Sequence, residues 1–172
     1  YPVVTGITWA GAYIEFGGAA FHDFAGGMIV HGMGGIAGLT AAYVLGPRMG
    51  RYNEDGSANV IPGHSLTFAV LGTLILAFGW YGFNVGTAAS VFALSESGEL
   101  TLGAFSYVGR VAMTTTIAMA MGAIGAAAAA WAKTGKVDTL YVANGLLAGL
   151  VGITAIPDTT SWWGAFLVGG LA

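Results

Sequence analysis

His31 is the residue of this sequence with the clearest chemical potential, because it lies in a long run without charge. The stretch DFAGGMIVHG, residues 23–32, has Asp23 at one end and His31 eight positions later, and no charged residue follows before Arg48. On a helix, His31 lies about 12 Å beyond Asp23 at 1.5 Å per residue, which is close to the middle of a bilayer. An ionisable side chain at that depth is a functional candidate, because placing it in lipid is costly.

Two glycines, Gly27 and Gly34, lie about one turn before and one turn after His31 and leave that helix face bare. A bare backbone beside the ring indicates an open path along the helix. The alternative is a neutral histidine bonded to a neighbouring helix. A metal or haem site is the least favoured interpretation, since His22 and His64 lie at span ends on opposite sides of the membrane. We therefore expect no metal site and no cofactor.

Asp23 opens the same predicted helix, and its simplest role is structural. A carboxylate at a helix N-terminus accepts hydrogen bonds from free backbone N–H groups and complements the helix dipole. If the helix lines a pore, the same carboxylate at its mouth shapes the entry of cations. Both interpretations stay open from the residues alone.

A second constellation is GWYGFNVGT, residues 79–87, toward the end of another uncharged run. Its aromatic side chains, Trp80 and Phe83 among them, are interface anchors or, for Phe83, a gate in a pathway. An aromatic face plugs water or holds a cation through its π electrons. Asn84 and Thr87 add polar groups with no obvious partner.

Polar residues of the later runs are candidates for bonds within or between helices. The hydroxyls of residues 114–116 can bond carbonyls of their own helix, and Thr154 and Asp158 can reach a neighbouring one. No Gly-rich phosphate loop, nucleophile motif or carboxylate pair is present. We therefore do not expect an enzyme.

The composition requires a membrane. Of the 172 residues, 56% are hydrophobic and 8% are charged, and the mean hydropathy is +0.76, whereas about a quarter of a soluble domain is charged. A net charge of −3 without a basic block argues against nucleic acid as a partner. The 30 glycines include pairs four residues apart, which let helix backbones approach closely. These pairs are Gly34 and Gly38, Gly82 and Gly86, and Gly145 and Gly149.

Uncharged runs approaching or exceeding the ~20 residues that cross a bilayer occupy most of the chain. They predict an all-α polytopic membrane protein with a single transmembrane domain over residues 1–172. The expected spans are 1–14 (partial), 24–46, 65–94, 105–132, 139–157 and 160–172 (partial). Since the chain begins with tyrosine and stops within an apolar run, we expect an internal piece of a longer protein.

The orientation follows from the basic residues of the three polar connections, 46–64, 95–110 and 133–138. Four of the five lysines and arginines lie in the first and third connections, which share a side if the helices alternate. The positive-inside rule then places these two connections in the cytoplasm and 95–110 outside. The stretch 1–22 lies at the outer face.

Longer motifs follow one another along the chain: DFAGGMIVHG and GIAGL, then GPRMGRY, GHSLTFAVLGTLILAFGWYGFN and NGLLAGLVGITA. In this order, and over essentially all 172 residues, the sequence resembles the ammonium transporter family (the Amt/MEP/Rh superfamily), and its classical Amt branch in particular. The resemblance implies a trimer whose protomers each have eleven helices, two inverted five-helix repeats and one narrow pore. This chain would hold the end of the fourth helix, the fifth through the eighth, and the start of the ninth.

The resemblance also implies roles for individual residues. His31 falls on the first of two pore histidines, and Phe83 on one of two phenylalanines that gate the outer vestibule. Trp9 and Thr87 fall at the site that recruits ammonium, where many members have a serine in place of Thr87. The remaining matches, which are structural or lie at the pore mouth, are Asp23, Asn84 and Thr154. The second pore histidine and the second gate phenylalanine lie on helices outside this chain.

The function implied by the resemblance is transport of ammonium or ammonia across the cell membrane. The cation is recruited and deprotonated, and ammonia then passes the pore histidines. A homotrimer and a PII-type regulatory protein on the cytoplasmic side are the implied partners. One alternative is an ammonium sensor that signals through an attached cytosolic domain. The other is a structural or cofactor-binding membrane subunit.

Overall fold

The computed structural model describes residues 15–16, 19–88, 93–94, 97, 99–101 and 105–172, so Trp9 lies outside the described residues. The helices are η1 (Gly27–Gly32), α2 (Met33–Leu45), α3 (Leu66–Trp80), η2 (Tyr81–Val85), α4 (Phe105–Thr134), α5 (Thr139–Ile153) and α6 (Trp162–Leu171). Two short antiparallel pairs, β1 (Glu15–Phe16) with β2 (Ala19–Ala20) and β3 (Ala93–Leu94) with β4 (Leu100–Thr101), complete the described elements. The segments η1 and η2 are π-helical and continue into or out of the adjacent α-helices.

Local sequence signals set the ends of the helices. The side chains of Ser65, Asp138 and Ser161 accept hydrogen bonds from first-turn amides of α3, α5 and α6, as expected of N-cap residues. Gly46 ends α2 and Gly135 follows the end of α4, each with a positive φ near 70° that favours glycine. These capping residues therefore define where the helices begin and end, and the turns lie between them.

Within the described residues, three helical stretches are long and apolar enough to cross a membrane: 27–45, 66–85 and 107–134. Two shorter apolar helices, α5 and α6, accompany them. The expected span 65–94 is longer than its helix, which ends at Val85. The uncharged run continues into β3, whose backbone groups bond to β4 instead. The length of an uncharged run therefore overestimated the length of this helix.

Helix α4 is the centre of the packed bundle, and it contacts α5 and α6 through small residues. A Cβ at Gly122 would clash with the Gly145 carbonyl of α5, and a Cβ at Gly169 of α6 would clash with the Ala118 carbonyl of α4. Ala118 is fully buried. Only small side chains allow backbones to approach so closely.

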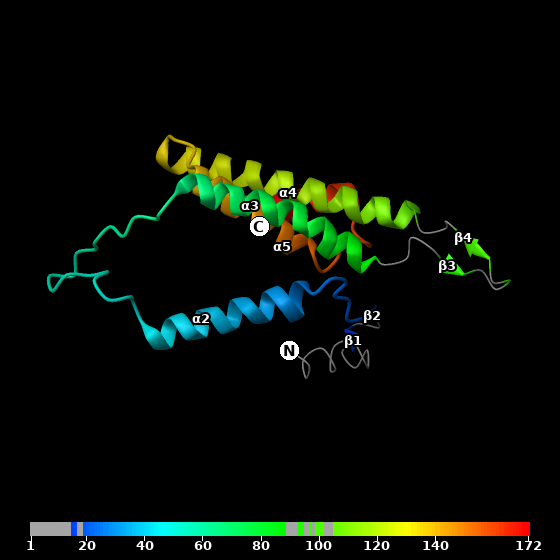
Figure 1. Cartoon of the computed structure of the whole chain (residues 1–172), viewed down its shortest axis with the longest axis horizontal. Coiled ribbons are helices and arrows are strands. Elements are labelled where there is room, and N and C mark those ends of the chain that lie inside the picture. The colour runs from blue at the N-terminus through cyan, green and yellow to red at the C-terminus, as the bar shows by residue number, and fades with distance from the viewer. Residues whose placement is uncertain (1–14, 17–18, 89–92, 95–96, 98, 102–104) are drawn as a thin grey trace.

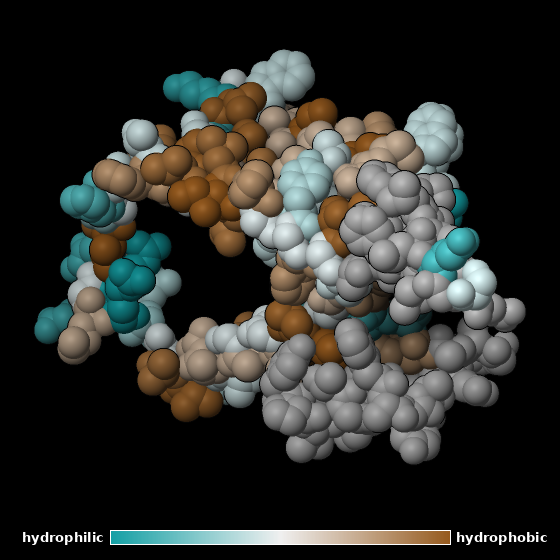
Figure 2. All heavy atoms as spheres, turned by 45° about the vertical axis from the view of Figure 1, so that its right-hand side comes forward, coloured by the Kyte–Doolittle hydropathy of each residue, from teal (hydrophilic) through white to brown (hydrophobic). Residues whose placement is uncertain are grey.

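Helix α2 has no buried residue and lies apart from the α3–α6 bundle in Figure 1. A Cβ added to any glycine of the pairs at 34 and 38 and at 82 and 86 would meet no atom within 4 Å among the described residues. Close approach is thus realised at Gly145 and Gly149 only, of the three expected pairs. Figure 2 shows apolar side chains over the outer surfaces of the helices, and Phe78 is 82% exposed. Such surfaces suit lipid or further protein rather than water.

The connections 46–64 and 133–138 lie at one end of the molecule, and both β-strand pairs lie at the other end (Figure 1). The two basic connections therefore share a side, as alternating helices require. The positive-inside rule predicts that this side is the cytoplasmic one.

Candidate functional site

His31 lies in η1 and meets two aromatic rings that come from the end of α3 and from η2. Its ring stacks on Trp80 with a centroid distance of 5.2 Å and an interplanar angle of 27°, and lies 5.6 Å from the ring of Phe83. Trp80 and Phe83 are themselves 5.6 Å apart. We call these three residues the aromatic cluster. They bring together the two candidate stretches of the sequence, residues 23–32 and 79–87.

The Nε2 atom of His31 is buried and has no hydrogen-bond partner among the described residues. A neutral imidazole offers one N–H donor and one acceptor lone pair, and the tautomer decides which nitrogen carries which. A buried imidazole nitrogen without a partner is uncommon, because the lost bond to water is not replaced. The geometry leaves this atom available to a small polar ligand at the aromatic cluster.

Trp80 is held in place by α5. Its Nε1–H donates to the Thr154 hydroxyl at 2.9 Å, and that hydroxyl donates to the Leu150 carbonyl at 2.6 Å. Thr154 is fully buried, so its bond to Leu150 forms away from water, while its bond from Trp80 is partly buried. The pair orients the indole ring on which His31 stacks.

The start of η1 is built by the DFAGG motif. Both carboxylate oxygens of Asp23 accept from the Met28 amide, at 3.1 and 3.2 Å, and one also accepts from the Ile29 amide at 3.0 Å. Gly26 takes a φ of 95°, and its carbonyl accepts from the His31 amide at 3.2 Å, which closes the π-helical turn. Asp23 is buried and caps the turn that carries His31.

The same segment is bonded to the chain that follows α5. The Phe24 amide donates to the Ala155 carbonyl at 2.9 Å, and the Ala25 amide donates to the Thr154 carbonyl at 3.1 Å. A Cβ at Gly27 would lie 2.7 Å from the Cβ of Ala155. The face at Gly27 is therefore covered by Ala155, contrary to the expectation of a bare helix face there.

Asn84 is fully buried in η2, one position after Phe83. Its amide donates to the Thr115 hydroxyl of α4 at 3.1 Å, while its Oδ1 atom has no partner among the described residues. The bond joins η2 to α4 and fixes the direction of the short π-helix. No partner for Asn84 was predicted from the sequence.

Thr87 and Phe83 lie on the more open side of the site. Both side chains are exposed, and the Thr87 hydroxyl donates to the Phe83 carbonyl at 2.8 Å. The hydroxyl oxygen keeps its acceptor lone pairs, so a cation could still be bound there. Trp9, expected beside them, falls outside the described residues.

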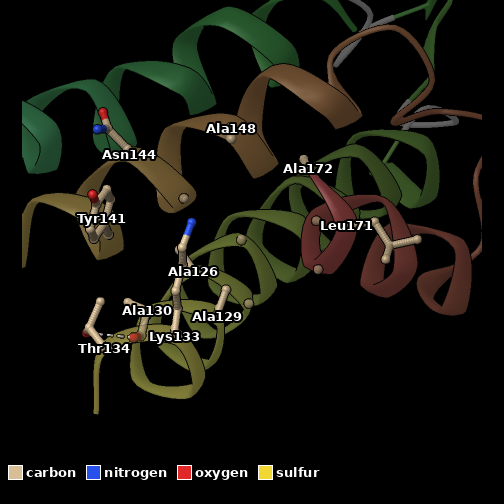
Figure 3. A pocket seen from close by; sticks show the side chains of 15 residues that line it. Ala126, Ala129, Ala130, Lys133, Thr134, Tyr141, Asn144, Ala148, Leu171 and Ala172 are labelled. Atoms are coloured by element: carbon tan, nitrogen blue, oxygen red, sulfur yellow. Dashed lines mark hydrogen bonds between the residues drawn. The ribbon is translucent and has the colours of Figure 1, made fainter. Parts of the chain in front are cut away.

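Titratable groups do not gather into a metal centre in the described parts of the chain, where no three His, Cys, Asp or Glu residues come together. A separate cavity of about 570 Å³ lies between α4, α5 and the end of α6 (Figure 3). Glycine and alanine make up most of its lining, to which Lys133, Tyr141 and Asn144 add polar groups. It shares no lining residue with the aromatic cluster.

The stacking of Trp80 on His31 was not predicted from the sequence, because a tryptophan near a span end is typical of an interface anchor. A signal was nevertheless present. Trp80 and Phe83 are three residues apart, which places them on the same helix face. If Phe83 faces a passage, Trp80 is therefore expected to face the same passage.

The chain matches the Ammonium Transporter Family over residues 1–172. It is 73% identical to "Ammonium transporter Amt2" of Haloferax mediterranei over 172 residues, which are 100% of this chain and 37% of that protein. Its structure resembles a "Sensor Amt Protein" (TM-score 0.73, 34% identity, 88% of this chain and 34% of that one). It also resembles Mep2 of Saccharomyces cerevisiae (TM-score 0.71, 31% identity, 88% and 31%). These likenesses confirm the predicted all-α membrane fold, and the chain spans roughly a third of the length of these proteins.

Proposed function

The chain belongs to the Ammonium Transporter Family, and from this premise we propose that the whole protein moves ammonium or ammonia across the cell membrane. It is an integral multi-pass membrane protein, and its relatives are transporters rather than enzymes. The observation that carries the proposal is the unpartnered, buried Nε2 atom of His31 inside a membrane helix. A buried polar atom without a partner lowers the stability of a purely structural helix, whereas a passage for a small polar molecule uses it as a hydrogen-bonding group.

The charge of ammonium decides the first step. A cation in an apolar passage loses its hydration, so direct crossing is costly. An aromatic face and a hydroxyl oxygen replace part of that water by cation–π and hydrogen-bond contacts. Phe83 and Thr87, which are exposed at the same helix end, supply both groups, with Trp9 as the third member.

The bound ammonium then transfers a proton to a water molecule, and neutral ammonia continues past His31; a current arises only if that proton also crosses the membrane. Ammonia donates and accepts hydrogen bonds, and an imidazole nitrogen can do either according to its tautomer. Trp80 and Thr154 hold the ring in one orientation, and Phe83 closes the side of the aromatic cluster toward the mouth. Asp23 and Asn84 have supporting roles, since their bonds shape η1 and η2.

The proposed assembly is a homotrimer with one pore per protomer, and a PII-type protein is the proposed cytoplasmic regulator. A second candidate function is ammonium sensing, which the likeness to a "Sensor Amt Protein" supports. A signalling domain attached outside this chain would favour sensing. The pore residues would then bind the ion without carrying a flux.

The test is an ammonium-triggered current from the full-length protein in proteoliposomes. We expect a current in the parent and about a hundredfold or larger loss in His31→Ala, the scale of removing a positioned proton-handling group. His64→Ala is the matched control, because His64 is an exposed histidine outside the aromatic cluster.

An unchanged current in His31→Ala would contradict the role of that residue. No current from a folded protein that still binds ammonium would favour the sensor. An internal pH dye then decides whether neutral ammonia crosses without current.

A further inference from the structure

A second group of polar side chains lies near the start of η1, outside the aromatic cluster. The Nε2 atom of His22 lies 2.9 Å from Oδ1 of Asp158, and the Tyr107 hydroxyl donates to Oδ2 of the same carboxylate at 3.3 Å. The three residues come from the segment before η1, from the turn after α5 and from α4. They join three parts of the chain at the end opposite the basic connections.

The Asp158 carboxylate is the centre of this group and is almost buried. Its side chain is 7% exposed, whereas that of His22 is 46% exposed. A carboxylate removed from water is stable only when its oxygens accept hydrogen bonds. Among the described residues, each oxygen accepts from one side-chain donor, so loss of His22 removes that partner of Oδ1.

The turn that carries Asp158 is anchored on its other side. The Thr114 hydroxyl of α4 donates to the Pro157 carbonyl at 2.7 Å, and Thr114 is fully buried. The turn is therefore attached to the central helix of the bundle. A residue that bonds to this turn is positioned relative to the most closely packed part of the molecule.

His22 connects that turn to the residues that lead to His31. Directly after His22, the Phe24 and Ala25 amides bond to the carbonyls of Ala155 and Thr154. The bond of His22 to Asp158 closes the free end of this short ladder. Without it, the bonds from Phe24 and Ala25 are the last that hold this segment on the side toward position 22.

We propose that His22, Asp158 and Tyr107 form a clasp that positions the His31 segment against the turn after α5. The proposal rests on the proposed function, because the position of His31 relative to Trp80 and Thr154 is what the clasp would maintain. The three are positioning residues, since none belongs to the aromatic cluster. Asp23, the neighbouring acid, is separately bonded to backbone amides.

The first test is hydrogen exchange of the full-length protein, which does not depend on transport. His22→Ala should raise exchange of the amides in residues 23–29 about tenfold, or about 1.4 kcal/mol. That is the scale of one half-exposed hydrogen bond to a carboxylate. Amides in the middle of α4 should not change, and His22→Gln, which keeps a donor, should restore much of the protection.

Three results would overturn the clasp: unchanged exchange in residues 23–29, an equal increase throughout α4, or the same effect in the control His64→Ala. The first means that His22 does not stabilise residues 23–29. The second means that it only stabilises the fold. The third means that the effect is unrelated to its position.

The second test compares currents of the same variants. We expect His22→Ala to lower the maximal current several-fold with little change in the half-saturating ammonium concentration, because the clasp acts on the segment of His31. Tyr107→Phe, which removes the other donor, should act in the same direction. A parent without current or ammonia flux refutes the proposed function, while the exchange result still decides the clasp. Faster exchange with an unchanged current refutes the positioning role.

Discussion

Replacing Gly27 by alanine should separate η1 from the turn after α5 and displace His31, which lies one turn further along. Gly34 is the matched control: it lies in the same helical stretch, a similar distance beyond His31, and a Cβ there meets no atom within 4 Å among the described residues. Both substitutions add one methyl group and the same intrinsic helix preference of Ala over Gly, about 1 kcal/mol. Their difference therefore isolates the contact at Gly27.

The magnitude follows from the contact distances. A Cβ at Gly27 would lie 2.7 Å from the Cβ of Ala155 and 2.8 Å from its backbone nitrogen, whereas an unstrained contact is about 3.5–4.0 Å. The two segments would have to separate by about 0.8–1.3 Å. Over-packing of this kind destabilises a protein by about 1–3 kcal/mol. A displacement of about 1 Å also lowers reaction rates by as much as about a hundredfold when it misplaces reacting groups.

The assay measures thermal unfolding of the purified full-length protein in detergent and the ammonium current in proteoliposomes. We expect Gly27→Ala to unfold at a lower temperature than Gly34→Ala and to carry at least about tenfold less current per folded protein. Equal stability and equal current in the two variants would refute the close approach of η1 to Ala155. A loss of stability with unchanged current would refute its effect on His31.

Two further predictions concern single hydrogen bonds. Trp80→Phe removes the donor to the buried Thr154 hydroxyl and should reduce the free energy of unfolding by about 1 kcal/mol; the exposed Trp131→Phe is the control in the same melting experiment. In the exposed connection, bonds from the Ser57 hydroxyl and amide hold the pKa of the Asp55 carboxyl below its usual value. They therefore stabilise the folded loop above the ordinary aspartate pKa, and this contribution is lost as the pH falls through the lowered value. Ser57→Ala should raise that pKa, measured by NMR titration of labelled aspartate, and an unchanged titration would contradict the hydroxyl bond.

The class of protein and the approximate positions of its helices could be predicted because the membrane imposes local rules. Backbone groups in lipid bond within their own helix, so each uncharged run of sufficient length indicates a helix without reference to the rest of the chain. Helix caps are equally local, and Ser65, Asp138 and Ser161 each act within one turn. The end of the 65–94 run was not predictable from charge alone, because its last residues pair as a strand.

The candidate residues were identified one at a time, but their arrangement was not. His31 and Phe83 belong to different runs, and nothing in either run states that their rings lie 5.6 Å apart. Trp80 was interpreted as an interface anchor because tryptophan occurs there so often. Its stacking on His31 and its bond to Thr154 depend on how α3, α5 and η1 meet.

The sequence by itself determined that this chain is a helical membrane protein and approximately where its apolar helices lie, because composition, charge and capping act over a few residues. Only the tertiary structure decided which of these residues meet. Gly145 and Gly34 each begin a glycine pair of the same spacing, yet one packs against α4 and the other faces open space in the described structure. A small residue permits close approach, but whether another helix packs against it depends on how the helices are arranged.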